Sequence, residues 1–180
     1  MKFNIDQEDF LIDKNIKLDN YNSYNSSLIY GEVNSNDIYN IINNVINTDN
    51  CDQHFLDIGS GCGKLILFFN NKTNYYCTGI EIIKHRYLKS IELINDDNSN
   101  VEFINDNFKN IYLGNFDIIY CCNIIFSNED NDLLFFKLIK EFNGYVLLFT
   151  YNNKISSKLI STHKVNTSWQ KNVLIHLFYF

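Results

Sequence analysis

The chain lacks proline altogether, and it lacks any long apolar run. No stretch approaches the roughly 18 uninterrupted apolar residues that a membrane-spanning helix needs, so no membrane contact is expected. The N-terminus has no basic segment followed by an apolar run, which argues against a secretory signal. We therefore expect an intracellular protein, located in the nucleus or the cytoplasm.

Positive charge is also scarce. Lys and Arg number 15 against 21 Asp and Glu, and the formal net charge is −6. This balance excludes a strongly basic surface and predicts at most weak nucleic-acid contact, whereas it suits a basic protein partner. The five cysteines form no Cys-x-x-Cys pair and no cluster with histidine, so no metal site is expected. Reduced thiols in an intracellular protein are the simpler interpretation.

Apolar residues are plentiful. Hydrophobic residues make up 46% of the chain and aromatic residues 16%, which excludes disorder of the whole chain. A length of 180 residues predicts a single domain, 1–180. Residues 1–29 are polar and aromatic, and they read either as a partly ordered arm or as a lid over a site. The core of the domain would then span 30–180.

Helical and strand-like patterns alternate along this core. Apolar residues recur at spacings of three and four from Ile38 to Ile46, which predicts an amphipathic helix. The nearly continuous apolar runs that follow are typical of buried parallel strands. We predict an α/β fold of the Rossmann-like type, with a mostly parallel sheet, helices on both faces and a C-terminal antiparallel strand pair. The predicted strands are 54–58, 75–80, 101–104, 116–121, 145–150, 158–167 and 172–180, and the predicted helices are 38–46, 64–70, 84–94 and 133–142.

A glycine-rich turn follows the first of these strands. Asp57 ends the strand, and Gly59, Gly61 and Gly63 follow at alternate positions before a helical pattern begins. Glycine has no Cβ and tolerates positive φ, so such a turn lets backbone approach a ligand closely. The spacing Asp-x-Gly-x-Gly-x-Gly differs from the Gly-x-Gly-x-x-Gly of dinucleotide enzymes. We predict that the turn, Ser60 included, holds a cofactor.

The second strand also ends in an acid. The run from Tyr75 to Ile80 leads directly into Glu81. An acid at this position is suited to holding a ribose diol, because open α/β sheets bind ligands at the carboxyl ends of their strands. The turn and the acid, in this order, look like the cofactor half of a class I S-adenosylmethionine-dependent methyltransferase. S-adenosylmethionine is therefore the predicted cofactor.

Residues after the third and fourth strands complete the predicted site. Asn107 and Phe108 follow the third strand, where an oxygen would accept the adenine amino group and the ring would stack on adenine. Asn is also a common turn former, which is the alternative interpretation. Asn123 and Phe126 follow the fourth strand, where this fold lays the acceptor beside the methyl group. Trp169 is either plain core or one wall of a narrow apolar acceptor channel.

Five stretches together resemble the histone-core lysine methyltransferases that lack a SET domain, the disruptor-of-telomeric-silencing type. The glycine turn is common to the superfamily, whereas the Tyr-Gly-Glu stretch and the Ser-Trp pair are more specific. The resemblance covers roughly residues 28–180 and, with a composition typical of AT-rich genomes, indicates a minimal and divergent viral or protist member. The stretches are Tyr30-Gly31-Glu32, 57–63, Gly79-Ile80-Glu81, 123–129 and Ser168-Trp169.

This resemblance implies roles for individual residues. Tyr30 and Glu32 would belong to a loop that flanks both the cofactor and a lysine channel. Asn123, Phe126 and Trp169 would shape that channel. The residues implied to hold the cofactor are Asp57, Gly59, Ser60, Gly61, Gly63, Glu81, Asn107, Phe108 and Glu32.

The predicted function is protein-lysine N-methylation, with a histone or a similarly basic protein as substrate. A neutral lysine amine would attack the sulfonium methyl in line. Enzymes that methylate amino groups of DNA bases carry a motif with two prolines after the fourth strand, and this chain has none. Two alternatives stay open. One is a methyltransferase with another protein or a small-molecule acceptor, and the other is an inactive module that only binds.

Overall fold

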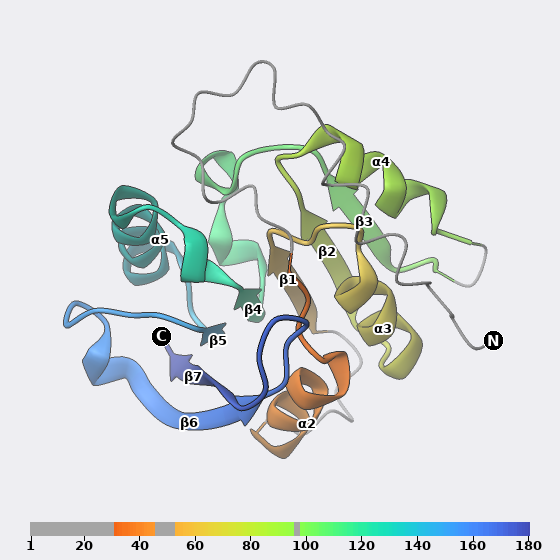
Figure 1. The fold of residues 1–180 in the computed structure, drawn as a ribbon. Coiled ribbons are helices and arrows are strands. Elements are labelled where there is room, and N and C mark those ends of the chain that lie inside the picture. The colour runs from red at the N-terminus through yellow and green to blue at the C-terminus, as the bar shows by residue number, and fades with distance from the viewer. Residues whose placement is uncertain (1–30, 46–52, 96–97) are drawn as a thin grey trace.

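The computed structural model describes residues 31–45, 53–95 and 98–180 (Figure 1). The predicted arm 1–29 and Tyr30 lie outside these residues. In the described part, seven strands form one sheet in the order β3-β2-β1-β4-β5-β7-β6. The strands are β1 (His54–Ile58), β2 (Tyr76–Ile80), β3 (Val101–Ile104), β4 (Ile118–Cys121), β5 (Tyr145–Leu148), β6 (Leu159–Val165) and β7 (Val173–Tyr179).

The direction of the strands confirms the predicted fold class. Strands β1 to β5 pair in parallel, β7 is antiparallel to β5, and β6 is antiparallel to β7. The chain moves from β1 outward to β2 and β3, and then returns to the other side of β1 with β4. Such a reversal opens a crevice at the carboxyl ends of the strands, which is where open α/β sheets bind ligands.

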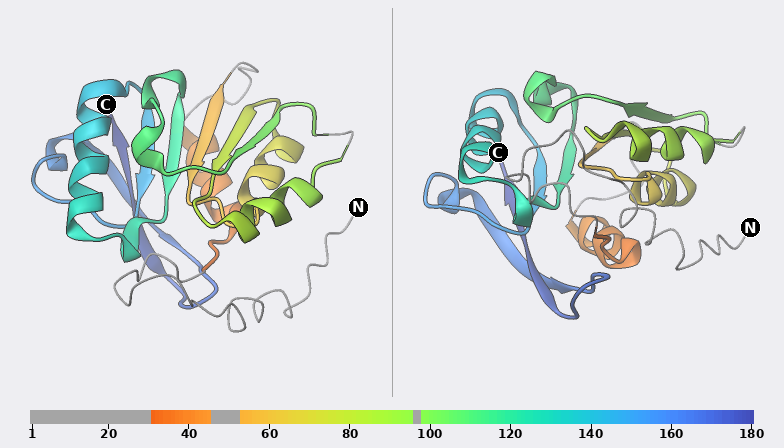
Figure 2. Two further views of the ribbon diagram at one scale, coloured as in Figure 1. Left: turned by 90° about the horizontal axis from the view of Figure 1, so that it is seen from above. Right: turned by 45° about the horizontal axis from the view of Figure 1, so that its top comes forward.

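Helices cover both faces of the sheet, as Figure 2 shows. On one face lie α2 (Ser35–Val45), α3 (Lys64–Lys72) and α4 (Lys84–Glu92), and on the other lies α5 (Asn128–Glu141). Side-chain caps begin α2 and α5. Asn34 Oδ1 accepts hydrogen bonds from the amides of Asn36 and Asp37 at 3.0 and 3.3 Å. Ser127 Oγ accepts one from Asp130 N at 3.0 Å, and such caps satisfy amides that a helix start leaves unpaired.

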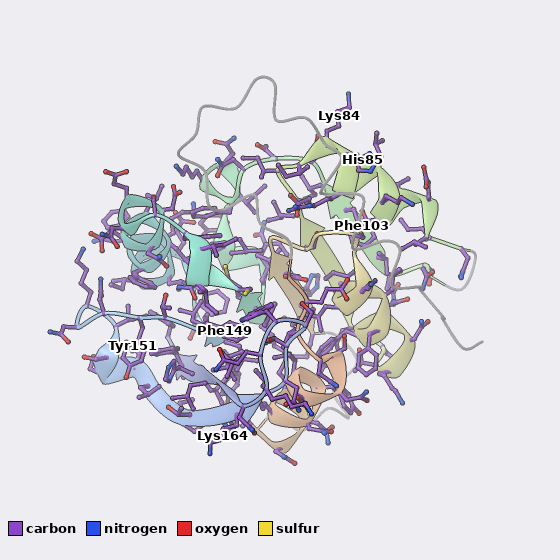
Figure 3. All side chains as sticks on the ribbon, in the orientation of Figure 1. Lys84, His85, Phe103, Phe149, Tyr151 and Lys164 are labelled. Atoms are coloured by element: carbon purple, nitrogen blue, oxygen red, sulfur yellow. The ribbon has the colours of Figure 1, made fainter. Side chains whose placement is uncertain are left out.

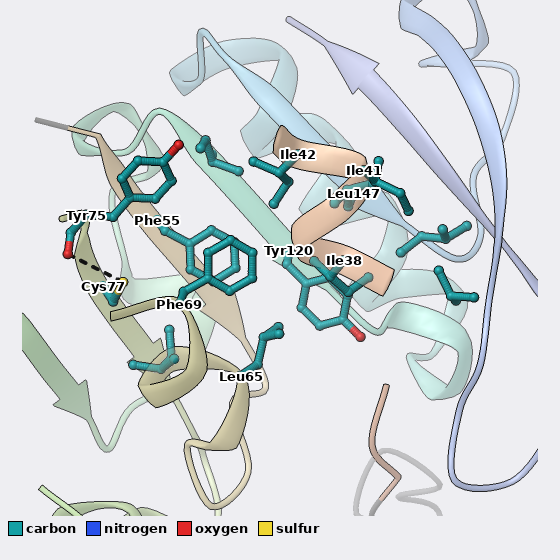
Figure 4. Close-up of a cluster of buried hydrophobic side chains, with 14 of the residues drawn as sticks. Ile38, Ile41, Ile42, Phe55, Leu65, Phe69, Tyr75, Cys77, Tyr120 and Leu147 are labelled. Carbon is teal, nitrogen blue, oxygen red and sulfur yellow. Dashed lines mark hydrogen bonds between the residues drawn. The ribbon is translucent and has the colours of Figure 1, made fainter. Parts of the chain in front are cut away.

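Two hydrophobic cores lie on opposite faces of the sheet. One joins α2 and α3 to the strands, and there the rings of Phe55 and Phe69 stack with centroids 4.3 Å apart (Figure 4). The other lies under α5, where Leu134 and Leu138 are fully buried. Because the central strands are buried on both faces, their sequences are continuously apolar rather than alternating.

Some strand ends differ from the predictions. The fifth strand stops at Leu148 rather than at residue 150, because the amides of Phe149 and Thr150 donate to Asn123 Oδ1 at 3.0 and 3.1 Å. The sixth strand stops at Val165 rather than at residue 167. None of the helices in the described ranges has the length and apolarity that a membrane crossing requires.

Candidate active site

The glycine turn begins where β1 ends. Gly59, Gly61 and Gly63 all have positive φ, at 84°, 57° and 82°. The amides of Gly59 and Ser60 both donate to the carbonyl of Ile80 at 2.9 Å, which ties the turn to the end of β2. A Cβ added at Gly59 would meet no atom within 4 Å, so the turn exposes bare backbone to open space. A ligand can therefore approach this backbone closely.

Glu81 is fixed beside this turn. Its Oε2 accepts a hydrogen bond from Gly61 N at 2.9 Å, and its Oε1 accepts one from Ile83 N at 2.7 Å. The residue is only 4% exposed. These bonds fix the carboxylate at the carboxyl end of β2, where open α/β sheets bind ligands. The geometry thus suits the predicted role of Glu81.

Asp57 and Ser60 each carry one buried oxygen without a hydrogen-bond partner among the described residues. These atoms are Asp57 Oδ1 and Ser60 Oγ. Burial, and secondly the neighbouring charge of Glu81, raise the pKa of Asp57 to about 8. Buried polar atoms without partners are costly unless a ligand completes them. The ammonium group of S-adenosylmethionine would supply both a donor and a positive charge, so these residues fit the cofactor.

A cavity of about 440 Å³ connects these groups, which is the size of typical small-ligand sites. It extends from the glycine turn to the segment that starts at Gly31 and to Trp169. Its lining is mixed in charge. The acids are Glu32, Asp57, Glu81, Asp106 and Asp130, and the bases are Lys64, Arg86 and Lys109.

One wall of the cavity is aromatic and joins two loops. The rings of Phe108 and Phe126 stack, with centroids 5.5 Å apart and planes inclined by 20°. Lys109 and Asp130 form an ion pair of 2.6 Å between the same two loops. Asn107 caps the short 3-10 turn here, because its side chain accepts from Lys109 N at 3.1 Å. Phe126 therefore lies against Phe108, the residue predicted to stack on adenine, and the place of Phe126 in a lysine channel stays a prediction.

Asn123 is completely buried, and it is not among the residues that line the cavity. Besides accepting from two amides of the segment after β5, its side chain donates to Asn131 Oδ1 at 2.6 Å and to the carbonyl of Thr150 at 2.9 Å. Every hydrogen-bonding position of this amide is occupied. We therefore expect Asn123 to position the wall of the site, not to touch an acceptor.

Trp169 borders the cavity at the turn between β6 and β7 and is 46% exposed. Its ring lies 6.4 Å from that of Phe149, which meets Tyr120 edge to face at 6.3 Å. Figure 3 shows Phe149 near the carboxyl end of β5. The half-exposed ring and its aromatic neighbours suit a channel wall better than a core position, so the role predicted for Trp169 stays a prediction that the geometry favours.

Sequence reasoning missed Tyr120 and Lys64, which both line the cavity. Tyr120 pairs with Asp57 in the register of β4 and β1. Residues that pair across two parallel strands point to the same face of the sheet. The position of Asp57 on β1 could therefore have predicted that Tyr120 on β4 lies in the site. Lys64 was interpreted only as the first residue of a helix, and nothing in its sequence context predicts the ion pair that it forms with Glu32. Over the described ranges, no group of three or more His, Cys, Asp or Glu side chains could hold a metal ion.

Comparison with known families decides the classification. The family model described as "Histone methylation protein DOT1" matches residues 9–173. This chain belongs to the DOT1 histone methylation family. The match begins earlier than residue 28, where the resemblance was expected to start. Comparison with curated proteins finds no significant match.

Solved structures similar to this DOT1-family chain are methyltransferases. An RNA methyltransferase from Salinibacter ruber in complex with S-adenosyl-L-homocysteine has a TM-score of 0.60 and 13% identity, covering 78% of this chain and 90% of its own. Magnesium protoporphyrin IX methyltransferase from Synechocystis PCC 6803 with bound S-adenosylmethionine has a TM-score of 0.62 and 11% identity. The match covers 81% of this chain and 79% of that protein. A methyltransferase structure from Methanococcus maripaludis has a TM-score of 0.50 and 22% identity. The match covers 61% of this chain and 52% of that protein.

Identities this low establish the fold and nothing about the acceptor. The fold is the Rossmann-like methyltransferase fold, and family and fold together make the chain an S-adenosylmethionine-dependent methyltransferase. S-adenosylmethionine is its cofactor, in agreement with the groups of the glycine turn, Asp57 and Glu81.

Proposed function

We propose that this chain is a protein-lysine N-methyltransferase whose substrate is a histone or a similarly basic protein. Membership of the DOT1 family supports this proposal. The observation that carries it is one continuous cavity that reaches from the cofactor groups, Asp57 and Glu81, to the exposed ring of Trp169. A cofactor and an extended side chain entering beside that ring would meet within it.

The reaction needs little acid–base machinery. The bound cofactor supplies an electrophilic methyl group, so the protein must mainly align the acceptor and exclude water. Such alignment contributes roughly 7–11 kcal/mol in favourable cases. The acceptor amine must be neutral, and desolvation between Trp169, Ile124 and the neighbouring wall would lower its pKa.

The charge of the cavity suits a cationic substrate. Among the described residues, four acids that ionise at neutral pH and three bases line it, whereas Asp57 has a pKa raised to about 8, and the whole chain carries a net charge of −6. A negative surface attracts a basic protein chiefly by speeding encounter. Few phosphate contacts are expected from such a surface, so the proposal predicts shallow salt dependence in the presence of DNA.

The test is incubation with labelled S-adenosylmethionine and three acceptors: free core histones, nucleosomes and a pool of small amines. Label in a histone band, with free histone modified at least as readily as nucleosomes, supports the proposal. Label that stays in small molecules would show another acceptor. Cofactor binding without any transfer would favour an inactive binding module, and strict dependence on nucleosomes with steep loss at high salt would contradict the expected weak contact with DNA.

A further inference from the structure

An ion pair links the cofactor turn to the segment that leads into α2. Lys64 is the first residue of α3 and follows the glycine turn directly. Its Nζ lies 2.6 Å from Oε1 of Glu32. Both side chains line the cavity and are only about a quarter exposed, at 26% and 23%. At this exposure the attraction is screened less than that of a fully solvated surface pair.

Glu32 is held at the same time by the turn between β6 and β7, which we name the hairpin tip (residues 166–172). Ser168 N donates to the carbonyl of Glu32 at 2.8 Å, and Glu32 N donates to Ser168 Oγ at 3.0 Å. Val33 and Thr167 form an antiparallel bridge beside these bonds. An isolated antiparallel bridge and two hydrogen bonds therefore hold the segment at Glu32 against the hairpin tip.

The hairpin tip carries Trp169, whose ring packs on Gly31. A Cβ added at Gly31 would lie 2.5 and 2.6 Å from two carbons of that ring, so only glycine allows this approach. At the other end of the contact, Asn166 N donates to Asp37 Oδ2 at 2.7 Å, which anchors the hairpin tip to the first turn of α2. Any shift of the segment 31–34 must therefore displace the indole ring or break these bonds.

We infer that Lys64 is a positioning residue that couples the cofactor turn, through Glu32 and the hairpin tip, to the acceptor side of the cavity at Trp169. The inference rests on the proposed function only in taking Trp169 as the border of the acceptor channel. Because Lys64 directly follows the turn that holds the cofactor, its ion pair would hold Glu32 in a fixed position relative to the cofactor. The hairpin tip would then hold Trp169 in the place that an acceptor side chain requires.

The physical argument is one of preorganisation. The segment is bonded to the hairpin tip through the carbonyl and the amide of Glu32, which pair with the amide and the side chain of Ser168, and neither bond involves the cofactor turn. The Lys64–Glu32 pair adds a contact between charged groups that are both fixed relative to the cavity. A partly exposed ion pair shifts an equilibrium by roughly two- to fivefold, which is enough to tune the position of a loop without deciding the fold.

The chain contains one tryptophan, so indole fluorescence reports on Trp169 alone. The experiment compares Lys64→Gln, Glu32→Gln and the charge exchange Lys64→Glu with Glu32→Lys. The matched control is Lys154→Gln, which removes a lysine from an exposed pair with Asp132 outside the cavity. For each protein, acrylamide quenching of Trp169 is measured without ligand and with S-adenosylhomocysteine, and circular dichroism verifies the fold.

The inference predicts that both single variants raise the quenching of Trp169 by up to about twofold, because the ring is already 46% exposed and a partly exposed pair shifts only part of the population. The charge exchange should restore quenching to near the wild-type value, and the control should not change it. Unchanged quenching in Lys64→Gln, or a charge exchange that restores nothing in a folded protein, overturns the inference. If a single variant does not fold, Lys64→Arg provides the second comparison, and it must retain wild-type quenching for the inference to hold. None of these readouts requires an acceptor, so they separate this inference from the identity of the substrate.

Discussion

The rings of Phe108 and Phe126 stack with their centroids 5.5 Å apart. Phe108 is buried and follows β3, whereas Phe126 follows β4, so the pair joins the loops at the ends of two strands on opposite sides of β1. Both rings line the cavity. A ligand that contacts one of them is therefore supported by the other.

This stacking makes a prediction for Phe126. Replacing Phe126 with alanine removes the ring that stacks on Phe108, whereas Phe108 itself is unchanged. Because an aromatic pair contributes about 0.5–1.5 kcal/mol beyond its buried area, we expect S-adenosylhomocysteine to bind about two- to tenfold more weakly. Calorimetric titration measures this. A variant that loses methyl transfer but keeps its cofactor affinity would show that Phe126 acts in the acceptor channel and not in cofactor binding.

Glu81 allows a graded test of the ribose contact. Glu81→Ala removes a carboxylate that orders the amides of Gly61 and Ile83, and it removes the expected bonds to the ribose. Charge-assisted bonds of this kind are worth about 1.5–3 kcal/mol, or roughly ten- to a hundredfold in Kd. Glu81→Gln keeps one acceptor oxygen, so its cofactor affinity should lie between those of the wild type and of Glu81→Ala. Equal cofactor affinity in all three folded proteins would exclude the role.

Asp57 predicts an unusual dependence of stability on pH. Burial raises its pKa to about 8, whereas a carboxyl in an unfolded chain has a pKa of about 4. Between these values the folded protein keeps a proton that the unfolded chain has lost. This group therefore makes the free energy of unfolding fall as the pH rises from about 4 to about 8, and the penalty is complete above that window.

Asp57→Asn mimics the protonated form at every pH and removes this contribution. Without cofactor, thermal unfolding should show the variant gaining stability over the wild type as the pH rises from 5 to 8. It should nevertheless bind cofactor more weakly, because an amide cannot balance the charge of an ammonium group. Parallel pH profiles for the two proteins would show that Asp57 is already ionised in the fold.

Asn123 is predicted to act through structure. Asn123→Ala leaves the amides of Phe149 and Thr150 without their acceptor. The Phe149 amide is buried, where a missing partner costs about 1–3 kcal/mol, and the partly buried Thr150 amide costs less, so unfolding by urea should show a loss of about 1–4 kcal/mol. At a pH where the acid is neutral, Asn123→Asp retains an acceptor for both amides and one O–H donor in place of two N–H donors, so it should be less harmful than alanine. A stable alanine variant that loses only methyl transfer would make Asn123 a group that touches the acceptor.

The strands and the cofactor turn could be predicted from the sequence because their signals are local. The run from His54 to Ile58 and the glycines after it fix both a buried strand and a tight turn within a few residues. The acid at Glu81 was predictable for the same reason, since it directly follows a strand. Parallel packing then brings these two ends together without any further information.

The acceptor side could not be predicted in the same way, because it depends on contacts between distant residues. The bonds of Glu32 with Ser168 span 136 positions, and those of Asn123 with Phe149 span 26. Asn123 was predicted from its place after β4, and its place is correct, yet the direction of its side chain depends on where β5 ends. The stacking of Phe108 and Phe126 likewise depends on two loops that only the fold brings together.

The most direct test of the central proposal identifies the atom that is methylated. Purified protein is incubated with S-adenosylmethionine and free core histones, and the histone peptides are sequenced by mass spectrometry, with Glu81→Ala as the negative control. The proposal predicts methyl groups on the side-chain nitrogen of histone lysine with the wild-type protein, and far fewer with the variant when the cofactor concentration is near the wild-type Kd. Cofactor binding by the wild-type protein with no methylated lysine in any histone would contradict it.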